Sequence, residues 1–244
     1  MNETTQTFDM AHIWAQGDAI SHAVAIMLVL MSVASWSVMI VKAWNLMKLR
    51  QMSAQAKAFW HATSFEAGLS TLTPTTADNP FRDLAVRGSE AVQHHVTHQD
   101  ELHGVLNLND WLTSTLRQSI DESTSRFQAG LSILASVGST APFIGLFGTV
   151  WGIYHALIGI GSAGQATLDK VAGPVGESLV MTAGGLAVAI PAVLGYNALV
   201  RGNKEILGRL KHFAHDLHAY LVTGGKIRSA RNVLPLNARK GAAQ

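Results

Sequence analysis

Cysteine is absent from the 244-residue sequence. The chain therefore cannot form a disulfide, bind a metal through thiolates or use a cysteine nucleophile. Charged residues are also scarce, at 14%, against about 25% in an ordinary soluble domain. Together with 48% hydrophobic residues and a mean hydropathy of +0.20, this argues against a disordered chain and against a purely soluble protein. The net charge of +2 is too small to indicate a nucleic-acid partner, and none is expected.

Three long stretches of the sequence lack Asp, Glu, Lys and Arg. Residues 19–41 and 178–200 are 23 residues long each, which is enough for a helix to cross about 30 Å of hydrocarbon. Residues 127–168 form the longest stretch, of 42 residues, and a helix of that length would extend about 63 Å. We therefore expect this stretch to cross once and to continue as helix beyond one face of the membrane. The pattern predicts an all-α membrane protein with three transmembrane helices.

Positive charge predicts the orientation of these helices, because Lys and Arg near a span are retained on the cytoplasmic side. Residues 1–19 contain no Lys or Arg, residues 42–128 contain eight, residues 159–177 contain one and residues 201–244 contain nine. We therefore expect an external N-terminus and a cytoplasmic C-terminus. The N-terminal segment also lacks the basic region of a cleavable signal peptide, so the first span is expected to stay as an anchor. The expected segments are an external N-terminal segment (1–19), a first span (20–41), a cytoplasmic helical loop (42–130), a second span (131–158), an external loop (159–176), a third span (177–200) and a cytoplasmic amphipathic helix with a basic tail (201–244).

The large cytoplasmic loop is predicted to consist of helical extensions instead of an enzyme domain. Residues 42–72 mix polar and apolar positions as a helix does, and a Pro/Thr-rich break follows at 73–80. From Phe81 onward apolar residues again recur at helical spacing. Asn107 to Asp110 can cap one more helix, which is expected to run without interruption into the second span.

After the third span, a stripe of apolar residues lies on an otherwise polar segment. A second surface has to cover this stripe, and the simplest candidates are the loop helices of the same chain or of a neighbouring copy. The last twenty residues are expected to form a flexible basic tail. The stripe consists of Ile206, Leu210, Phe213, Leu217 and Leu221.

Histidines cluster in two places, which raises the question of a metal site. Spacings of three and four residues can place two imidazoles on one helix face, but no cysteine or carboxylate lies in ligand register. We therefore favour packing or solvated histidines and expect no metal site. The sequence also has no Ser/His/Asp arrangement, phosphate-binding glycine loop or HExxH motif, so neither a catalytic site nor a cofactor is expected and the protein is not predicted to be an enzyme. The clusters are His94, His95, His98 and His103, and His212, His215 and His218.

The second and third spans are rich in small and polar residues. Small residues let helix backbones approach closely in lipid, where packing drives helix association. Several hydroxyl side chains lie in the same spans, and Ser132, Ser136 and Ser139 share one face of the second. One hydroxyl can bond to a carbonyl of its own helix, but several in one bundle indicate a wet lumen. The glycines predicted to pack helices are Gly145, Gly148 and Gly152 in the second span and Gly184 and Gly185 in the third.

Glu177 stands at the start of the third span, directly after Gly173-Pro174-Val175-Gly176. Proline is favoured at the first position of a helix, so we expect the helix to begin at Pro174 and Glu177 to lie in its first turn. Two interpretations stay open from the residues alone. Glu177 is either an interfacial capping carboxylate or a functional carboxyl, and burial in the second case would favour the protonated form that a proton relay needs.

Two motifs link the chain to a known family. They are STAPFIGLFGTVWGIYHAL at residues 139–157 and DKVAGPVGESLVMTAGGLAVAIPAVLGYNALVR at residues 169–201. Both resemble the ExbB/TolQ/MotA proton-channel family, most closely its ExbB members. The length, the three spans and the large loop after the first span are also similar to that family.

The resemblance implies a multi-pass subunit of a Gram-negative inner membrane, with its N-terminus in the periplasm. Such subunits surround the helices of an ExbD-like protein as a homo-oligomeric, pentameric ring in contact with membrane lipid. With a TonB-like protein, the complex uses proton-motive force to energise outer-membrane uptake of ferric siderophores and vitamin B12. By motif, Glu177 corresponds to the family's proton carrier, and Thr149 and Thr182 to polar residues that line the lumen.

Two alternatives remain beside this interpretation. A TolQ-like subunit of the Tol-Pal system would act in outer-membrane constriction at division. A passive membrane scaffold would have the same topology and would be indifferent to loss of the Glu177 carboxyl.

Overall fold

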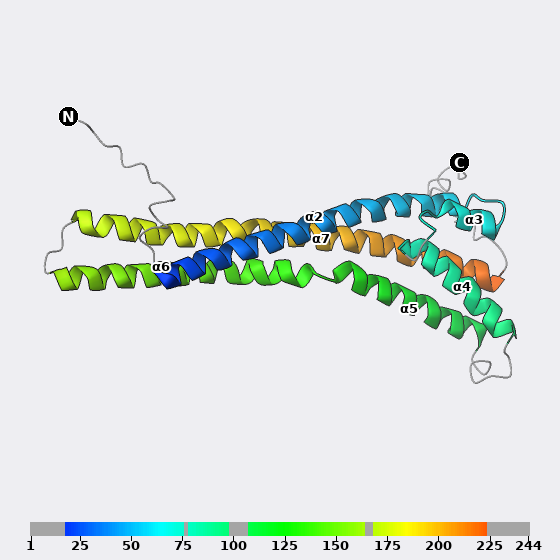
Figure 1. The fold of residues 1–244 in the computed structure, drawn as a ribbon. Coiled ribbons are helices and arrows are strands. Elements are labelled where there is room, and N and C mark those ends of the chain that lie inside the picture. Colours follow the sequence, from blue (N-terminus) through cyan, green and yellow to red (C-terminus); the bar gives the residue numbers. More distant parts are fainter. Residues whose placement is uncertain (1–17, 76–77, 98–106, 164–167, 224–244) are drawn as a thin grey trace, which may run out of the picture. The chain divides into compact units, whose positions relative to one another are not determined.

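The computed structural model describes residues 18–75, 78–97, 107–163 and 168–223. Within these ranges the chain forms helices and no strand, so it has the all-α fold expected from the sequence (Figure 1). Three helical segments are long and apolar enough to cross a membrane, one each in α2, the α5–α6 segment and α7. The helices are α2 (Ala19–Phe59), α3 (Phe65–Thr71), α4 (Pro80–Thr97), α5 (Leu108–Gln128), α6 (Leu131–Ala163) and α7 (Leu168–Thr223).

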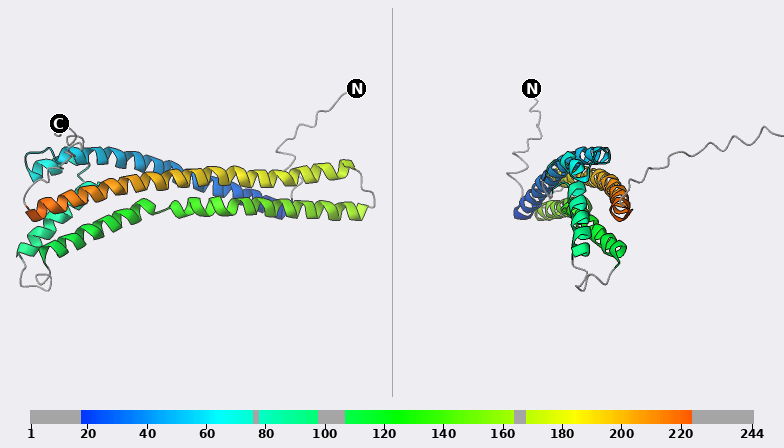
Figure 2. Two further views of the ribbon diagram at one scale, coloured as in Figure 1. Left: turned by 180° about the vertical axis from the view of Figure 1, so that it is seen from behind. Right: turned by 90° about the vertical axis from the view of Figure 1, so that its right-hand side faces the viewer.

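The helices build two compact units, which are described separately. The first, here called the span unit, comprises Met1–Arg50 and Ser125–Ile206, and the second, the loop unit, comprises Gln51–Thr124 and Leu207–Gln244. In the span unit the start of α2, α6 and the first part of α7 lie alongside one another (Figures 1 and 2). Each helix bonds its own backbone, which is what an apolar surrounding requires.

Two apolar clusters hold the three helices of the span unit together. Each cluster takes residues from all three helices, and small alanines at the centre of the first bring α6 and α7 close. The first cluster consists of Val24, Leu28, Val137, Ala141, Ala189 and Ala192. The second consists of Leu46, Leu131, Leu134, Leu199 and Ile206.

The expected uninterrupted helix leading into the second span is broken at Gly130. Helix α5 ends at Gln128 and α6 begins at Leu131. Gly130 has a φ of +78°, a left-handed conformation that glycine adopts without steric cost. The expectation of one continuous helix was therefore wrong, because this glycine ends a helix instead of packing inside one.

The helix expected over residues 42–72 is also divided in two. Helix α2 ends at Phe59, and α3 begins after Ser64, whose hydroxyl accepts a hydrogen bond from the Ala67 amide at 3.1 Å. A Cβ atom at Gly68 would lie 2.8 Å from the Phe59 ring. The close return of α3 onto Phe59 therefore depends on glycine at position 68.

In the loop unit, α2, α4 and α5 of the same chain cover the apolar stripe of α7. The Phe213 ring lies 5.2 Å from that of Phe59 and 5.6 Å from that of Phe81. A Cβ at Gly88 would lie 3.1 Å from the Leu221 side chain, so α4 and α7 are in contact here too. Leu210 and Leu217 are fully buried, which confirms that the stripe is a packing surface.

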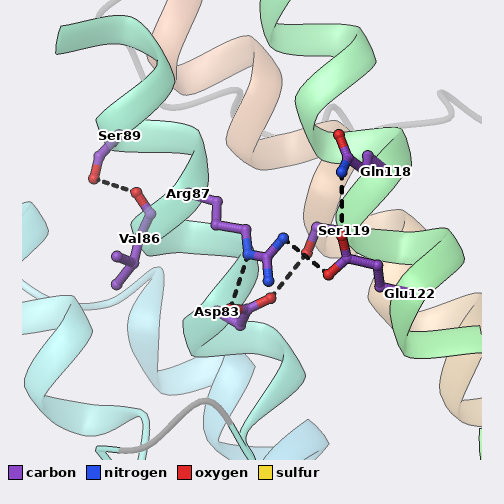
Figure 3. A network of polar contacts seen from close by, with 7 residues as sticks. All are labelled: Asp83, Val86, Arg87, Ser89, Gln118, Ser119 and Glu122. Atoms are coloured by element: carbon purple, nitrogen blue, oxygen red, sulfur yellow. Dashed lines mark hydrogen bonds and ion pairs between the residues drawn. The ribbon is translucent and has the colours of Figure 1, made fainter. Parts of the chain in front are cut away.

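A polar network joins α4 to α5 in the same unit (Figure 3). The Arg87 side chain donates to Asp83 at 3.0 Å and pairs with Glu122 at 2.9 Å, while the Ser119 hydroxyl donates to Asp83 at 3.1 Å. Partial burial alone would lower the pKa of Arg87, but the two carboxylates outweigh it and raise that pKa. Arg87 therefore stays charged and links the two helices.

Candidate functional site

Helices α6 and α7 bring their backbones into contact at two glycines of the span unit. A Cβ at Gly145 would lie 2.5 Å from the Met181 carbonyl oxygen and 3.1 Å from the Gly185 Cα. A Cβ at Gly185 would lie 2.6 Å from the Ala141 carbonyl oxygen. Only glycine at both positions allows this backbone contact.

Three hydroxyl residues continue this contact along α6 and α7. Thr149 is 6% exposed and Ser178 is 5% exposed. The Thr149 hydroxyl lies 3.1 Å from the Gly145 carbonyl oxygen and 3.0 Å from the Ser178 carbonyl oxygen, and it contacts the Thr182 hydroxyl. A hydroxyl carries one hydrogen, so Thr149 shares this hydrogen between the two carbonyl oxygens and accepts a hydrogen bond from Thr182. We call Gly145, Thr149, Ser178, Thr182 and Gly185 the α6–α7 seam.

The remaining glycines proposed for packing lie in different surroundings. A Cβ at Gly148 would lie 2.9 Å from Val24 of α2 and 3.1 Å from Met181 of α7, so this position touches both neighbours. Gly152 faces the Ser178 side chain. Gly184 has only Leu28, at 3.7 Å, near a Cβ position, which is an ordinary contact that does not require glycine.

Of the two threonines expected to line a lumen, Thr149 is enclosed within the single chain and Thr182 keeps part of its side chain exposed. The exposed face of α6 is instead occupied by Ser132, Ser136 and Ser139, followed by apolar side chains further along the helix. The Ser139 hydroxyl donates to the Ser136 carbonyl at 3.0 Å. The exposed serines thus carry the polar face that the hydroxyl pattern indicated.

Glu177 lies in α7 directly before the buried Ser178, and its side chain is outside the part of the chain that the structure describes. Helix α7 begins at Leu168, not at Pro174, so Glu177 follows the first helical residue by nine positions. The expectation that Glu177 caps the helix in its first turn was therefore wrong. Proline removes one backbone hydrogen bond, and such a loss near the start of a long membrane helix is tolerated where neighbouring groups satisfy the freed carbonyl.

The described histidines do not come together as a metal site. Among the residues described, no group of three or more potential ligands is close enough to hold a metal ion. The His94 ring is tilted by 31° against that of Trp111, with 6.4 Å between ring centres, and His218 bonds to Thr113 at 3.2 Å. His98 and His103 lie outside the described residues, as do the basic residues of the C-terminal tail.

Sequence reasoning missed a polar contact at the start of α2. Asp18 accepts a hydrogen bond from the Trp151 indole at 2.6 Å, and His155 approaches the same carboxylate at 3.9 Å. The available signals were an aspartate directly before an apolar helix, typical of an N-cap, and two ring residues four positions apart in α6. Neither signal indicates that the two sites meet.

The seam makes a prediction about stability. Replacing Thr149 with valine removes the hydroxyl that joins α6 to α7, and we expect a loss of about 1 kcal/mol, within the range measured for hydrogen bonds between membrane helices. Thr140→Val is the matched control, because among the described residues the Thr140 hydroxyl bonds to Ser136 of its own helix and not to α7, and its effect should stay within about 0.5 kcal/mol. The unfolding midpoint of each purified variant in detergent gives the comparison. Equal shifts for both variants would show that the bond between the helices adds no stability.

Comparison with known proteins identifies the family. Residues 89–212 match the MotA/TolQ/ExbB proton channel family. The chain is 39% identical to the biopolymer transport protein ExbB of Xanthomonas campestris over 86% of this chain and 85% of that protein. It is 41% identical to ExbB of Neisseria meningitidis, over 86% of this chain and 96% of that protein. It is also 34% identical to the Tol-Pal system protein TolQ of Pseudomonas aeruginosa, over 81% of this chain and 86% of that protein. With matches of this extent and three candidate membrane helices, the chain belongs to the MotA/TolQ/ExbB proton channel family and is a channel subunit of the ExbB/TolQ type.

Proposed function

We propose that this protein is the ring-forming proton-channel subunit of a TonB–ExbB–ExbD type complex in the inner membrane. The observation that carries the proposal is its similarity to proteins named ExbB over 86% of its length. The complex would use proton-motive force to energise TonB-dependent uptake of ferric siderophores and vitamin B12 across the outer membrane. The N-terminus would lie in the periplasm and the C-terminus in the cytoplasm, an orientation that the distribution of Lys and Arg supports.

The exposed face of α6 supports a ring with an internal partner. This face is polar at Ser132, Ser136 and Ser139 and apolar at Phe143 and further residues. A face made only for lipid would have no reason to carry three serines, whereas a lumen that holds partner helices and some water would. We assign this face to the lumen of a homopentamer, in contact with the helices of an ExbD-like protein.

Glu177 is proposed as the proton carrier, with the seam as its support. It directly precedes Ser178, whose carbonyl accepts the Thr149 hydroxyl. Thr182, partly exposed, would face the lumen, and Thr149 would lie behind it and hold α7 to α6. An ionisable residue within a membrane helix, next in sequence to a residue of a polar seam, is typical of proton pathways.

The closest functional alternative is a TolQ-like role in outer-membrane constriction. We prefer the ExbB role because the ExbB proteins of Xanthomonas and Neisseria are 39–41% identical to this chain, against 34% for TolQ of Pseudomonas aeruginosa, although ExbB of Pseudomonas putida is 31% identical. The growth phenotype of a deletion strain distinguishes the ExbB-like role from the TolQ-like role. Deletion of the gene should abolish growth on ferric siderophores as the iron source and leave the outer membrane intact, whereas a TolQ role predicts leakage of periplasmic proteins and chained cells.

Proton transport tests the proposal directly. The chain is reconstituted in liposomes alone and together with its ExbD-like partner, and proton entry is followed after a pH step with a potassium diffusion potential. We expect flux above the empty-liposome level only when both subunits are present, because each alone leaves the lumen incomplete. Flux of equal size from the chain alone would contradict a shared pathway, and assembled complex without flux, even with the TonB-like protein added, would favour a scaffold.

A further inference from the structure

Asp18 performs two structural tasks at the start of α2. Its carboxylate accepts a hydrogen bond from the Ser21 amide at 2.8 Å and so caps the helix. The other carboxylate oxygen accepts the Trp151 indole N–H at 2.6 Å. One side chain therefore both starts the first candidate membrane helix and attaches it to α6.

His155 lies beside this contact, within 3.9 Å of the same carboxylate. Its Nδ1 atom is 3.2 Å from the Trp151 carbonyl oxygen, and its Nε2 atom is 3.9 Å from the Asp18 carboxylate. A carbonyl can only accept, so the hydrogen of a neutral imidazole has to be on Nδ1 for that bond to form. The Nε2 lone pair then faces a carboxylate. Only a second proton turns Nε2 into a donor toward Asp18.

The groups around His155 are few among the residues described. The Trp151 and Tyr154 rings contact it from α6 itself, with ring centres 4.5 and 5.4 Å away. From α2, Asp18 is the acidic group that faces it, and His22 is the next titratable group along that helix. From α7 no ion pair with His155 is formed by a residue whose side chain is described. Among the described residues, Asp18 is therefore the group that would interact most strongly with a proton on His155.

The same turn of α6 is held by α7. Gly148 packs on Val24 of α2, Trp151 bonds to Asp18, and between them Thr149 bonds to Ser178. Helices α2 and α7 therefore contact the same turn of α6. A change in the contact with α2 would also affect Thr149, which belongs to the α6–α7 seam.

We propose that Asp18, Trp151 and His155 form a proton-responsive latch, in which protonation of His155 tightens the attachment of the start of α2 to α6. The hydrogen bond from Trp151, opposed in part by desolvation and aided by Ser21 and His155, lowers the pKa of Asp18 to about 2. Asp18 is therefore ionised throughout the pH range of the experiment described below. The inference rests on the proposed function only for its placement on the periplasmic side, the side from which protons would enter.

The latch can be tested by measuring the distance between α2 and α6. The chain contains no cysteine, so Ala19→Cys and Leu157→Cys, both at exposed positions, carry the only two spin labels. Labelled protein is diluted into an excess of unlabelled full-length chain, so that distances within one chain dominate. Electron–electron double resonance then gives the distance distribution at about pH 5 and about pH 8, the range over which histidine changes charge.

We expect the distribution to narrow at the lower pH in the parent protein and in the His22→Gln control. The narrowing should be lost in His155→Gln and in Asp18→Asn. Asparagine is a good N-cap, so Asp18→Asn keeps the start of α2 while it removes the charge. An unchanged distribution in the parent protein, or narrowing that persists in His155→Gln or in Asp18→Asn, would overturn the latch. Proton flux does not enter this readout, so failure of the latch and failure of the channel proposal are distinguishable.

Discussion

Glu177→Gln is expected to abolish proton flux through the assembled complex and to leave the complex itself intact. Glutamine has nearly the shape of glutamate, but its amide cannot take up and release a proton near neutral pH. Proton transfer through position 177 would therefore stop. The proton flux should fall to the background level of empty liposomes, and cells with this variant should not grow on ferric siderophores. Flux is measured at equal amounts of assembled complex, quantified by native electrophoresis before reconstitution.

Two further variants make this result specific. Glu177→Asp retains a carboxyl and should restore part of the flux. Glu205→Gln removes a carboxylate that is half-exposed and pairs with Arg50 at 3.7 Å, and it should transport protons at the parent rate. If Glu177→Gln conducts protons as the parent does, the protons follow a path that avoids this residue and the assignment fails.

Gly145→Ala is expected to have the largest effect on folding. The added Cβ would meet the Met181 carbonyl oxygen and the Gly185 Cα, and neither backbone atom can move without displacing α7. Overpacking costs about 1–3 kcal/mol where side chains can adjust, and a backbone obstacle places this change at or above the upper end. We expect a strongly lowered unfolding midpoint in detergent and little of the proposed oligomeric ring.

Gly161→Ala is the matched control in the same helix. A Cβ at Gly161 would meet no described atom from outside its own stretch of helix within 4 Å. Alanine is the better helix former by about 1 kcal/mol, so this variant should be neutral or slightly more stable. A Gly145→Ala protein as stable as Gly161→Ala would mean that α6 and α7 do not need their close backbone contact.

Much of the helical architecture follows from the sequence, because a chain in an apolar medium has to bond its backbone internally and three stretches are apolar enough to do so. The stripe from Leu210 to Leu217 likewise predicted a covered face. The break at Gly130 could not be predicted, since glycine is common inside membrane helices and only the backbone conformation separates a break from a packing position. The preference of proline for the first position of a helix led to the wrong start of α7. That preference says where proline is most frequent, but a longer helix can also contain a proline after its first turn, as α7 does at Pro174.

The candidate site was only partly predictable for a related reason. Gly145, Thr149 and Thr182 could be selected by residue type and by resemblance, but the carbonyl groups that Thr149 bonds are set by how α6 lies on α7. Asp18 and Trp151 are 133 residues apart in sequence. Nothing in the local pattern at either place requires the other, so their contact emerges only from the packed helices.

The continuity of α7 constrains how the length of this protein can change in evolution. The helix contacts α6 at Thr182 and Gly185 and then contributes Leu199 and Ile206 to the second cluster of the same unit. One inserted residue between these positions would rotate the later pair by about 100° and turn it away from its partners. Insertions of about 7, 11 or 18 residues nearly restore the angle, whereas other short insertions do not. Gains and losses of sequence are therefore expected in the connections, such as residues 60–64 and 72–79, while the spacing along α7 stays fixed.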